Sequence, residues 1–468
     1  MAKFEAVVVG GGPGGYECAI RLAQYGIKTA LIEENKDEGL GGTCLNRGCI
    51  PAKTLLMSSD LYKEMKESAT FGVSCDNIAY DYKAVKERKC NVSKTLRNGI
   101  AGLCKSHGVE VIYARAVLTD AHTLSLSNGE TVEADKIVLA TGSQPARIPI
   151  PGIDLPGVVD STGLLDLEEC PKKVVIVGGG VIGIEFATHF TNLGVEVTIL
   201  EMLDTILAPL DADISSAMAA KLEKNGAVIK TGVRVTGIAE GLKVTYAAKD
   251  GSESTVDADV VLMAGGRRPN SRDIGLEKVG VATTRRGHVE TDGLCRTNVP
   301  GIYAIGDLNG KMELAHAASA QGLQVAAHIA GKPCKAVDLN KIPSCVYTSP
   351  EAAMVGMTEK KAAESGRDYE VSIFGMSGNG KAMVMGQNEG MVKLITDKAT
   401  GEILGAHLLA PRATDMISEF VTLMAAEGTV DELAAAVHPH PTVSEALMEA
   451  AHVVHGNCVH APKPRKKK

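Results

Sequence analysis

The sequence predicts an α/β protein built from two similar parallel-sheet modules and a third, α+β domain. Three observations support this prediction. A short apolar run leads directly into a glycine-rich turn at Gly10, and the same arrangement returns at Gly178. The separation is far longer than the roughly 20–50 residues of stacked repeats, so it indicates a duplicated domain. Beyond Pro343 the pattern changes to alternating strand-like segments followed by helical ones.

Length and composition agree with several packed domains. The 468 residues are 45% hydrophobic and 22% charged, which is ordinary for a globular protein. No apolar run reaches the roughly 18 residues that span a bilayer. We place a first module at 1–150, a second module at 151–270, a segment that returns to the first at 271–341, and the terminal domain at 342–468.

Each module begins as a strand–turn–helix–strand unit, the βαβ arrangement of parallel sheets. In the first module we expect a strand at 6–9, a helix at 16–25 and a strand at 29–32. The second module repeats the unit at 174–177, 185–193 and 197–200. Apolar segments that end in glycine follow at 137–142, 260–266 and 302–306. In the terminal domain we expect antiparallel strands at 391–396 and 403–409, and helices at 414–426 and 443–454.

The charge pattern argues against a nucleic-acid partner. The net charge is −7, and five basic residues occupy the last six positions, so the body of the chain is more acidic still. The Lys-rich end is interpreted as a solvated tail. An apolar strand begins by Ala6, which leaves no room for a signal or transit peptide, so we expect a cytoplasmic location. Most of the 11 cysteines should then be thiols.

Both turns have the glycine spacing of a dinucleotide fingerprint. A pyrophosphate requires one glycine for the tight turn, a second for close backbone approach and a third for helix–strand packing. The matching residues are Gly10, Gly12 and Gly15, and then Gly178, Gly180 and Gly183. A lone match is weak evidence, because ordinary glycine turns look the same. Two matches, each between a strand and a helix, predict two Rossmann-like modules that bind two nucleotide cofactors.

A carboxylate follows the second strand of each unit, at Glu33 and at Glu201. In this position a carboxylate accepts hydrogen bonds from ribose hydroxyls, whereas the 2′-phosphate of NADP requires arginine. No basic residue follows Glu201 until Lys221. The second site is therefore expected to prefer NAD over NADP.

Cys44 and Cys49 form the most informative pair in the chain. Five residues along a regular helix leave the two thiols about 140° apart around the axis. A disulfide requires closer Cα atoms, so the backbone must depart from a regular helix, which Gly42, Gly48 and Pro51 permit. A distorted disulfide is a reducible one. Two structural thiols, or half of a metal site, remain alternatives, although the metal reading lacks a second ligand pair.

The two fingerprints with Cys-x4-Cys between them resemble the pyridine nucleotide–disulfide oxidoreductases over nearly the whole chain. Leu45, Ile50 and Glu201 make it similar to the dihydrolipoamide dehydrogenase group of that family. The segment from His438 to Glu445 resembles the family's active-site motif. A histidine before proline is by itself an unremarkable turn residue. The resemblance gives His440 the role of base and Glu445 the role of orienting it.

The resemblance implies flavin-dependent oxidation of dihydrolipoamide by NAD. Each subunit would hold one non-covalent FAD, with NAD as co-substrate and no metal. Cys44 would exchange with the substrate dithiol, and Cys49 would face the flavin. The protein would be a homodimer in which His440 acts across the interface. The lipoyl group would come on a separate carrier, either the lipoyl domain of an E2 component or the glycine cleavage H protein, without membrane insertion.

The resemblance also assigns further cofactor contacts, and it makes 1–150 with 271–341 the FAD domain, 151–270 the NAD domain and 342–468 the interface domain. Lys53 would lie beside the flavin ring, paired with Glu185. Asp307 would meet the ribityl chain. The other carried-over positions are Gly41, Gly42, Thr43, Ala116, Thr141, Gly142, Ser143, Val235, Gly266, Leu314, Ala315 and His316.

The chain departs from the family pattern at Arg47, Ala52, Glu313 and Gln321. We expect these departures to affect the details of substrate preference and not the class of reaction. A glutathione reductase-like enzyme is the closest alternative, but it should carry arginines after the second fingerprint. Mercuric reductase should end in a vicinal cysteine pair, whereas Cys458 stands alone. A redox-inert flavin-binding assembly protein is less favoured, because Cys44, Cys49 and His440 are all present.

Overall fold

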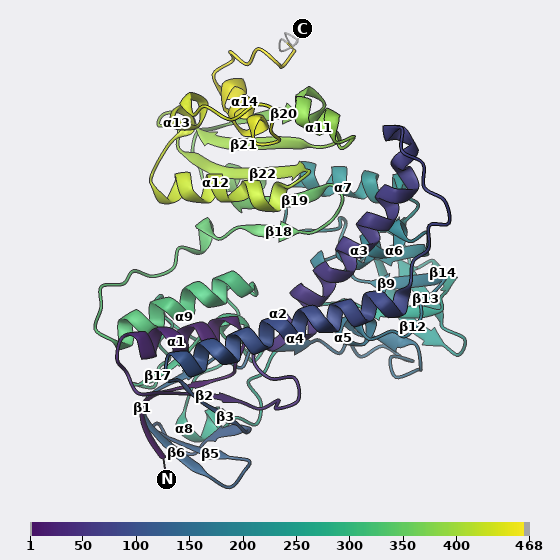
Figure 1. The fold of residues 1–468 in the computed structure, drawn as a ribbon. Coiled ribbons are helices and arrows are strands. Elements are labelled where there is room, and N and C mark those ends of the chain that lie inside the picture. Colours follow the sequence, from purple (N-terminus) through teal and green to yellow (C-terminus); the bar gives the residue numbers. More distant parts are fainter. Residues whose placement is uncertain (1, 463–468) are drawn as a thin grey trace.

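The computed structural model describes residues 2–462 (Figure 1). The basic residues from Lys463 onward, predicted as a solvated tail, lie outside the described residues. Two modules with parallel strands occupy the lower and right-hand parts of the view, and the C-terminal domain lies above them. The predicted class, two parallel-sheet modules with a terminal α+β domain, is confirmed.

The first sheet combines N-terminal strands with one strand from much later in the chain. Its order is β3-β2-β1-β6-β5-β4, and β17 also pairs with β6. Positions 6–9 of β1 are all buried, as expected for a parallel strand covered on both faces. Ile302 lies opposite Ile137 in parallel register, so the later segment completes the first sheet. The strands are β1 (Ala2–Val9), β2 (Thr29–Glu33), β3 (Glu110–Tyr113), β4 (Ala116–Leu118), β5 (Thr123–Leu126), β6 (Thr131–Leu139) and β17 (Ile302–Ala304).

The second module repeats the parallel core and adds an antiparallel layer. Its main sheet has the order β11-β10-β9-β15-β8, beside a three-stranded sheet β12-β13-β14. The strands are β8 (Val158–Val159), β9 (Lys173–Val177), β10 (Glu196–Leu200), β11 (Val228–Lys230), β12 (Val233–Ala239), β13 (Lys243–Ala248), β14 (Glu253–Asp257) and β15 (Val260–Met263). A two-stranded antiparallel pair, β7 (Ser143–Pro145) with β16 (Arg267–Pro269), joins the connections between the two modules.

The helices that follow the two glycine turns begin earlier than predicted. α1 (Pro13–Gln24) and α6 (Val181–Asn192) start at the fingerprints rather than at residues 16 and 185. The reason is that the extended middle glycines, Gly12 and Gly180, serve as N-caps. α9 (Ala315–Ile329) packs along α1. The other helices of the two modules are α2 (Gly42–Arg47), α3 (Cys49–Glu67), η1 (Ser68–Phe71), α4 (Tyr82–Ser106), α5 (Ser161–Leu165), α7 (Ala212–Lys224), α8 (Leu276–Val279) and η2 (Gly306–Asn309).

The C-terminal domain is a five-stranded antiparallel sheet of order β18-β19-β22-β21-β20 with helices against it. Its elements are η3 (Leu339–Lys341), β18 (Ser344–Val346), β19 (Glu351–Gly356), α10 (Glu359–Glu364), β20 (Tyr369–Gly375), η4 (Met376–Gly378), α11 (Gly380–Val384), β21 (Met391–Asp397), β22 (Ile403–Ala410), α12 (Ala413–Ala425), α13 (Val430–Ala435) and α14 (Glu445–Val454). Val346, Ala352 and Leu409 of this domain join the apolar core of the second module. The two domains therefore share one core.

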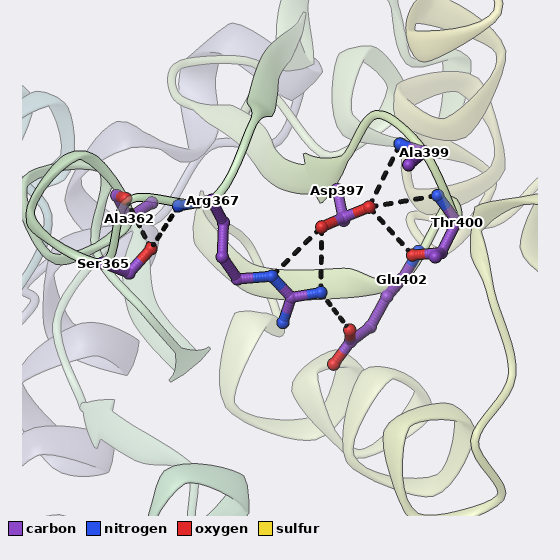
Figure 2. Close-up of polar contacts among 7 residues, drawn as sticks. All are labelled: Ala362, Ser365, Arg367, Asp397, Ala399, Thr400 and Glu402. Carbon is purple, nitrogen blue, oxygen red and sulfur yellow. Dashed lines mark hydrogen bonds and ion pairs between the residues drawn. The ribbon is translucent and has the colours of Figure 1, made fainter.

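A polar cluster fixes the far end of β21 (Figure 2). The guanidinium of Arg367 donates to Asp397 from Nε at 3.0 Å and to Glu402 from a terminal nitrogen at 2.5 Å. The second carboxylate oxygen of Asp397 accepts the backbone N–H groups of Ala399 and Thr400, each at 3.0 Å. The turn between β21 and β22 is therefore held by one carboxylate.

Candidate active site

The first glycine fingerprint forms a tight loop between β1 and α1. Gly10 has φ +106°, and a Cβ there would collide with the carbonyl of Ala140. A Cβ on Gly15 would collide with the carbonyl of Gly10, so the third glycine allows the helix to approach the strand. Gly12 caps α1 without a side-chain hydrogen bond, which leaves N–H groups of the first turn for an anion. The loop fits a dinucleotide pyrophosphate.

The second fingerprint has the same construction. Gly178 has φ +116°, and a Cβ there would collide with the carbonyl of Ala264. A Cβ on Gly183 would collide with the carbonyl of Gly178. Gly180 caps α6 in an extended conformation, and a Cβ there would meet no atom within 4 Å. This loop therefore also fits a pyrophosphate, with open space at its middle glycine.

The two predicted ribose carboxylates lie at these loops. An oxygen of Glu33 accepts the N–H of Gly11 at 2.8 Å, and an oxygen of Glu201 accepts the N–H of Gly179 at 2.5 Å. Burial raises the pKa of Glu33, against the effect of the backbone N–H groups that bond to it. Both carboxylates are thus held beside the position where a bound nucleotide would run.

The cysteine pair lies where two helices meet. Cys44 belongs to α2, Cys49 begins α3, and Gly48 between them has φ −146° and ψ −113°. The predicted departure from a regular helix is observed there. A Cβ on Gly48 would lie 2.9 Å from the carbonyl oxygen of Thr43, so the break requires a glycine.

The helices that carry the cysteines are attached to the first glycine loop. The N–H of Gly41 donates to the carbonyl of Gly11 at 2.8 Å. A Cβ on Gly42 would lie 2.6 Å from the Cα of Gly12, so the two backbones are in close contact. Gly41 and Gly42 both have positive φ, at +105° and +58°. The cysteine pair is therefore positioned directly beside the first nucleotide loop.

The two cysteines differ in their acidity. Both are free thiols in the structure. The hydrogen bond with Cys44 lowers the pKa of Cys49 to about 7, a shift that burial opposes and the charge of Lys53 supports. The same hydrogen bond, together with burial, raises the pKa of Cys44. The charge of Lys53 acts on both sulfurs and favours a thiolate in this pair.

Lys53 is fixed by an ion pair between the modules. Its Nζ lies 2.7 Å and 2.8 Å from the two carboxylate oxygens of Glu185, a side chain of α6 that is 6% exposed. The N–H of Tyr347 donates to the same carboxylate at 3.1 Å, and the Lys53 ammonium lies 4.5 Å from the centre of the Tyr347 ring. The structure thus brings together the pair that the resemblance implied. No sequence signal marked Tyr347, which reaches this site from the C-terminal domain.

Asp307 forms a second polar cluster with Ser143. The hydroxyl of Ser143 donates to Asp307 at 2.5 Å, and Arg267 donates from Nε to that hydroxyl at 2.7 Å. A terminal nitrogen of Arg267 also donates to the carbonyl of Ser143 at 2.8 Å. Arg267 belongs to β16 and was missed, because only the pairing of β7 with β16 brings it here.

The loop at Thr141 and Gly142 is held by Asn270, which follows β16. The Thr141 hydroxyl donates to the carbonyl of Asn270 at 2.8 Å, and the Asn270 amide donates back to the carbonyl of Thr141 at 2.9 Å. The N–H of Asn270 donates to Gly142. Sequence reasoning also missed Asn270, whose role depends on a partner far away in the chain.

The remaining predicted contacts are spread over both modules. Leu314 caps α9, which Ala315 and His316 begin, and Nε2 of His316 donates to the carbonyl of Pro343 at 2.8 Å. Ala116 begins β4 in the first module. In the second module Val235 lies in β12, and Gly266, with φ +115°, separates β15 from β16.

The four residues that depart from the family pattern each have identifiable contacts in the structure. Arg47 forms a surface ion pair with Glu38 at 2.6 Å. The buried Gln321 accepts the N–H of Gly306 at 2.8 Å. Ala52 is part of the core, and Glu313 lies 3.6 Å from a nitrogen of His288.

His440 and Glu445 are joined by a hydrogen bond of 2.9 Å from Nδ1. Burial would raise the pKa of Glu445, but the Thr442 N–H and the His440 ring lower it below its ordinary value. The imidazole side chain is 78% exposed. Because Nδ1 bonds to the carboxylate, Nε2 is the ring nitrogen that could take up a substrate proton.

The histidine pair and the cysteine pair lie in different parts of one chain. Figure 1 shows α14, which begins at Glu445, near the top of the C-terminal domain, and α2 well below it at the junction of the modules. Within one chain, the helix that begins at Glu445 and the helix that carries Cys44 therefore lie apart.

Among residues 2–462, no helix combines the length and the apolar character that crossing a membrane requires. Within the part of the chain that the structure describes, no group of three or more His, Cys, Asp or Glu side chains is arranged to hold a metal ion.

Comparison with known proteins identifies relatives along almost the whole chain. Residues 4–322 match the family model described as pyridine nucleotide-disulphide oxidoreductase, and residues 342–451 match the dimerisation domain of the same family. Dihydrolipoyl dehydrogenase of Geobacillus stearothermophilus is 41% identical over 98% of this chain and 97% of its own. Mitochondrial dihydrolipoyl dehydrogenase of Pisum sativum is 39% identical, covering 97% of this chain and 92% of its own.

Solved structures of similar chains share the fold. The HOCl-induced flavoprotein disulfide reductase RclA of Escherichia coli is 32% identical with a TM-score of 0.87, covering 96% of this chain and 100% of its own. LpdA of Mycobacterium tuberculosis is 28% identical with a TM-score of 0.88, over 97% and 100% of the two chains. With both glycine loops and the cysteine pair in place, the chain belongs to the pyridine nucleotide–disulphide oxidoreductase family, whose cofactors are FAD and NAD(H).

Proposed function

We propose that this protein oxidises the dithiol of a dihydrolipoyl group to its disulfide, with NAD as the final electron acceptor. The observation that carries this proposal is the cysteine pair at the break between α2 and α3, where the pKa of Cys49 is lowered to about 7 beside Lys53. The substrate class is supported by the relatives of about 40% identity, which are named dihydrolipoyl dehydrogenases.

The charge of Lys53 and the family resemblance support one assignment of the two cysteines in the exchange. A substrate thiolate attacks the sulfur of Cys44 in the Cys44–Cys49 disulfide, so that a substrate–Cys44 bond forms and Cys49 leaves as a thiolate. The charge of Lys53 lowers the pKa of the Cys49 thiol. Because a leaving thiol of low pKa departs faster, Lys53 favours Cys49 in that position. The second substrate thiol then attacks the substrate sulfur of the mixed disulfide and releases Cys44. The proton of this second substrate thiol passes to Cys44. The proton of the first substrate thiol passes to Nε2 of His440. Two electrons now reside on the cysteine pair.

Bound FAD and NAD supply the onward two-electron transfer from the cysteine pair. The residues that would hold FAD are those of the first glycine loop with Glu33, Ser143 and Asp307. The second glycine loop and Glu201 would hold NAD. Lys53 and Glu185 hold the start of α3, which carries Cys49, against α6 of the second module.

We further propose that the active form is a homodimer in which His440 serves the cysteine pair of the partner subunit. The match to a dimerisation domain and the separation of α14 from α2 within one chain support this arrangement. The carrier of the lipoyl group is then a separate lipoylated protein, which docks where two chains meet.

Complementation between two inactive variants tests the shared site. Cys49→Ser and His440→Gln are each expected to lose turnover, the second by a factor of roughly 10²–10⁴. After the two are unfolded together and refolded with FAD, each mixed dimer has one site with an intact cysteine pair and an intact histidine. Activity should return to about a quarter of the wild-type level. No recovery, with mixed dimers shown by mass spectrometry, would contradict a site built from two chains.

Anaerobic steady-state kinetics with the FAD-loaded protein test the substrate. Dihydrolipoamide and a dihydrolipoylated carrier domain should each be oxidised with NAD, and NADP should be a poor acceptor. Glutathione disulfide with NADH or NADPH is the control for a glutathione reductase-like enzyme. Turnover of glutathione disulfide without turnover of lipoamide would overturn the substrate assignment while leaving the cysteine pair as the redox centre.

A further inference from the structure

A fully buried lysine joins the second module to the C-terminal domain. The side chain of Lys393 on β21 is 1% exposed, and its Nζ donates to Asp211 at 2.8 Å, to Asp213 at 2.6 Å and to Glu359 at 2.6 Å. Burial alone would lower the pKa of Lys393, but these three hydrogen bonds raise it above its ordinary value. The two aspartates belong to the start of α7, and Glu359 belongs to α10. The ammonium therefore connects two domains.

Asp211 bonds to both domains with one carboxylate. It is the N-cap of α7, and one of its oxygens accepts the N–H of Asp213 at 3.2 Å as well as Lys393. The other oxygen accepts the N–H of Glu359 at 2.9 Å. Burial would raise the pKa of Asp211, but the hydrogen bonds from Lys393 and Glu359 lower it. Only 2% of this side chain is exposed, so the contact is a buried ion pair.

The elements on both sides of Lys393 are themselves fixed. Asp397, at the end of the same strand, is held by Arg367 (Figure 2). The far end of α7 is tied to the C-terminal domain as well, because Lys221 and Lys224 form ion pairs with Glu389. α7 is thus clamped to the C-terminal domain at both ends.

The same helix is linked to the second nucleotide loop. The segment between Glu201 and Asp211 passes through Leu207, whose N–H donates to the carbonyl of Gly179 at 2.8 Å. The hydroxyl of Ser215, in the first turn of α7, donates to the carbonyl of Leu207 at 3.2 Å. Leu207 is buried and has φ +47°, so this segment has one tightly determined path. A shift of α7 would move Gly179 and with it the glycine loop.

We propose that Lys393 is a positioning residue for the pyridine nucleotide. Through Asp211 it fixes α7 and the segment 201–211, and so holds the second glycine loop and Glu201 in the geometry that binds NAD. This inference rests on NAD binding by the second module and is independent of the dithiol substrate. It predicts that a contact in the C-terminal domain sets the affinity for a nucleotide bound in a different domain.

Binding of NAD⁺ to the FAD-loaded protein, measured by calorimetry, tests this inference. Lys393→Met removes the charge and keeps the length of the side chain. We expect its Kd for NAD⁺ to rise roughly tenfold, with FAD content unchanged and with faster amide hydrogen exchange over residues 201–211. In NADH-driven reduction of a dye, KM should rise while kcat at saturating NADH is retained. Lys398→Met is the matched control, because Lys398 pairs with Asp368 on the surface just beyond the same strand.

A second variant covers the case in which Lys393→Met does not fold. Removing one partner of a buried pair leaves an uncompensated charge, which is strongly destabilising. Lys393→Met with Asp211→Asn removes the two buried charges and leaves only Asp213 and Glu359, whose side chains are about half exposed. Asparagine remains a good N-cap for α7. The double variant should fold and still bind NAD⁺ weakly, whereas Lys393→Arg should restore part of the affinity. Wild-type Kd and wild-type exchange over 201–211 in a folded variant without the lysine would overturn the proposal.

Discussion

The two glycine loops have nearly the same backbone, but their surroundings differ. In the first loop, a Cβ on Gly12 would lie 3.8 Å from the Cα of Gly42, so the cysteine helix covers the loop. In the second loop, a Cβ on Gly180 would meet no atom within 4 Å, and the adjacent Val181 is 37% exposed. One phosphate-binding unit is therefore enclosed and the other is open.

The difference matches two ways of using a nucleotide. An enclosed site suits a cofactor that stays bound through many turnovers, and an open site suits a co-substrate that binds and leaves in each one. The helices agree with this division. α1 lies under α9 so closely that a Cβ on Gly14 would be 2.8 Å from the carbonyl oxygen of Ala318, whereas α6 packs on α3, which begins with Cys49. The same local sequence pattern thus acquires two functions from what the rest of the chain places over it.

Equivalent substitutions in the two loops should have the largest and the most unequal effects. Gly15→Val and Gly183→Val each place a side chain against the carbonyl of the first glycine of its own loop. We expect Gly15→Val to yield protein without FAD and without activity, measured by the flavin absorbance per chain. Gly183→Val should retain FAD and lose NAD binding. Equal loss of FAD in both variants would contradict the division between the loops.

Cys49→Ser should leave both glycine loops intact and abolish the oxidation of dihydrolipoamide. The variant is expected to keep FAD at the wild-type ratio and to lower turnover of dihydrolipoamide to background, because no disulfide can form. Binding of NAD⁺ by calorimetry is the control for the second loop. Normal lipoamide turnover in this variant would contradict the disulfide mechanism.

Glu201→Arg should change the preference between NAD and NADP at the second, open glycine loop. The carboxylate repels the 2′-phosphate of NADP, so its replacement by a cation should shift the ratio of kcat/KM for NAD and NADP toward NADP by about tenfold, or ~1.4 kcal/mol. The glutamate also bonds to Gly179, so a Glu201→Gln control separates loss of that bond from the change of charge. An unchanged ratio would count against the ribose contact.

At the contact between α3 and α6 the expected effect is on stability and not on activity. Burial lowers the pKa of His189 from 6.5 to about 4. An unfolded chain takes up a proton between these values and the folded protein does not, so stability is full above about pH 6.5 and falls as the pH drops toward 4, by about 1–3 kcal/mol. His189→Leu should lose less melting temperature between pH 7.5 and pH 5 than the wild type. Asp60, with a pKa raised to about 6 mainly by burial, titrates in the opposite sense but is common to both proteins.

An equal fall in melting temperature for both proteins would assign the acid sensitivity to other groups. The natural comparison is Asp60→Asn, in which the opposing titration at the same helix contact is removed and the fall should be steeper.

Local requirements explain which features the sequence could predict. The backbone at Gly10 and Gly178 needs a glycine whatever surrounds it, so the fingerprint identified both loops. The break at Gly48 follows from residues a few positions apart. The predicted helix starts were wrong because the glycine-rich stretches were taken wholly as turns, whereas the middle glycine of each acts as the N-cap.

Contacts made by distant partners could not be predicted in this way. Arg267 meets Ser143 across 124 positions of the chain, and Lys393 meets Asp211 across 182. Before the sheets pair, such side chains look like ordinary surface charges. The preference for NAD was inferred from the lack of a basic residue just after Glu201 in the sequence. That inference missed Lys249, which follows β13 and forms an ion pair with Asp204 in this stretch.

Electron passage from the open nucleotide site to the cysteine pair is tested most directly by counting thiols. The FAD-loaded protein is alkylated anaerobically before and after addition of NADH, and the modified cysteines are identified by mass spectrometry. We expect two thiols to become newly reactive, at Cys44 and Cys49, with the other nine unchanged. No newly reactive thiols, or new reactivity at other cysteines, would contradict a redox centre at this pair.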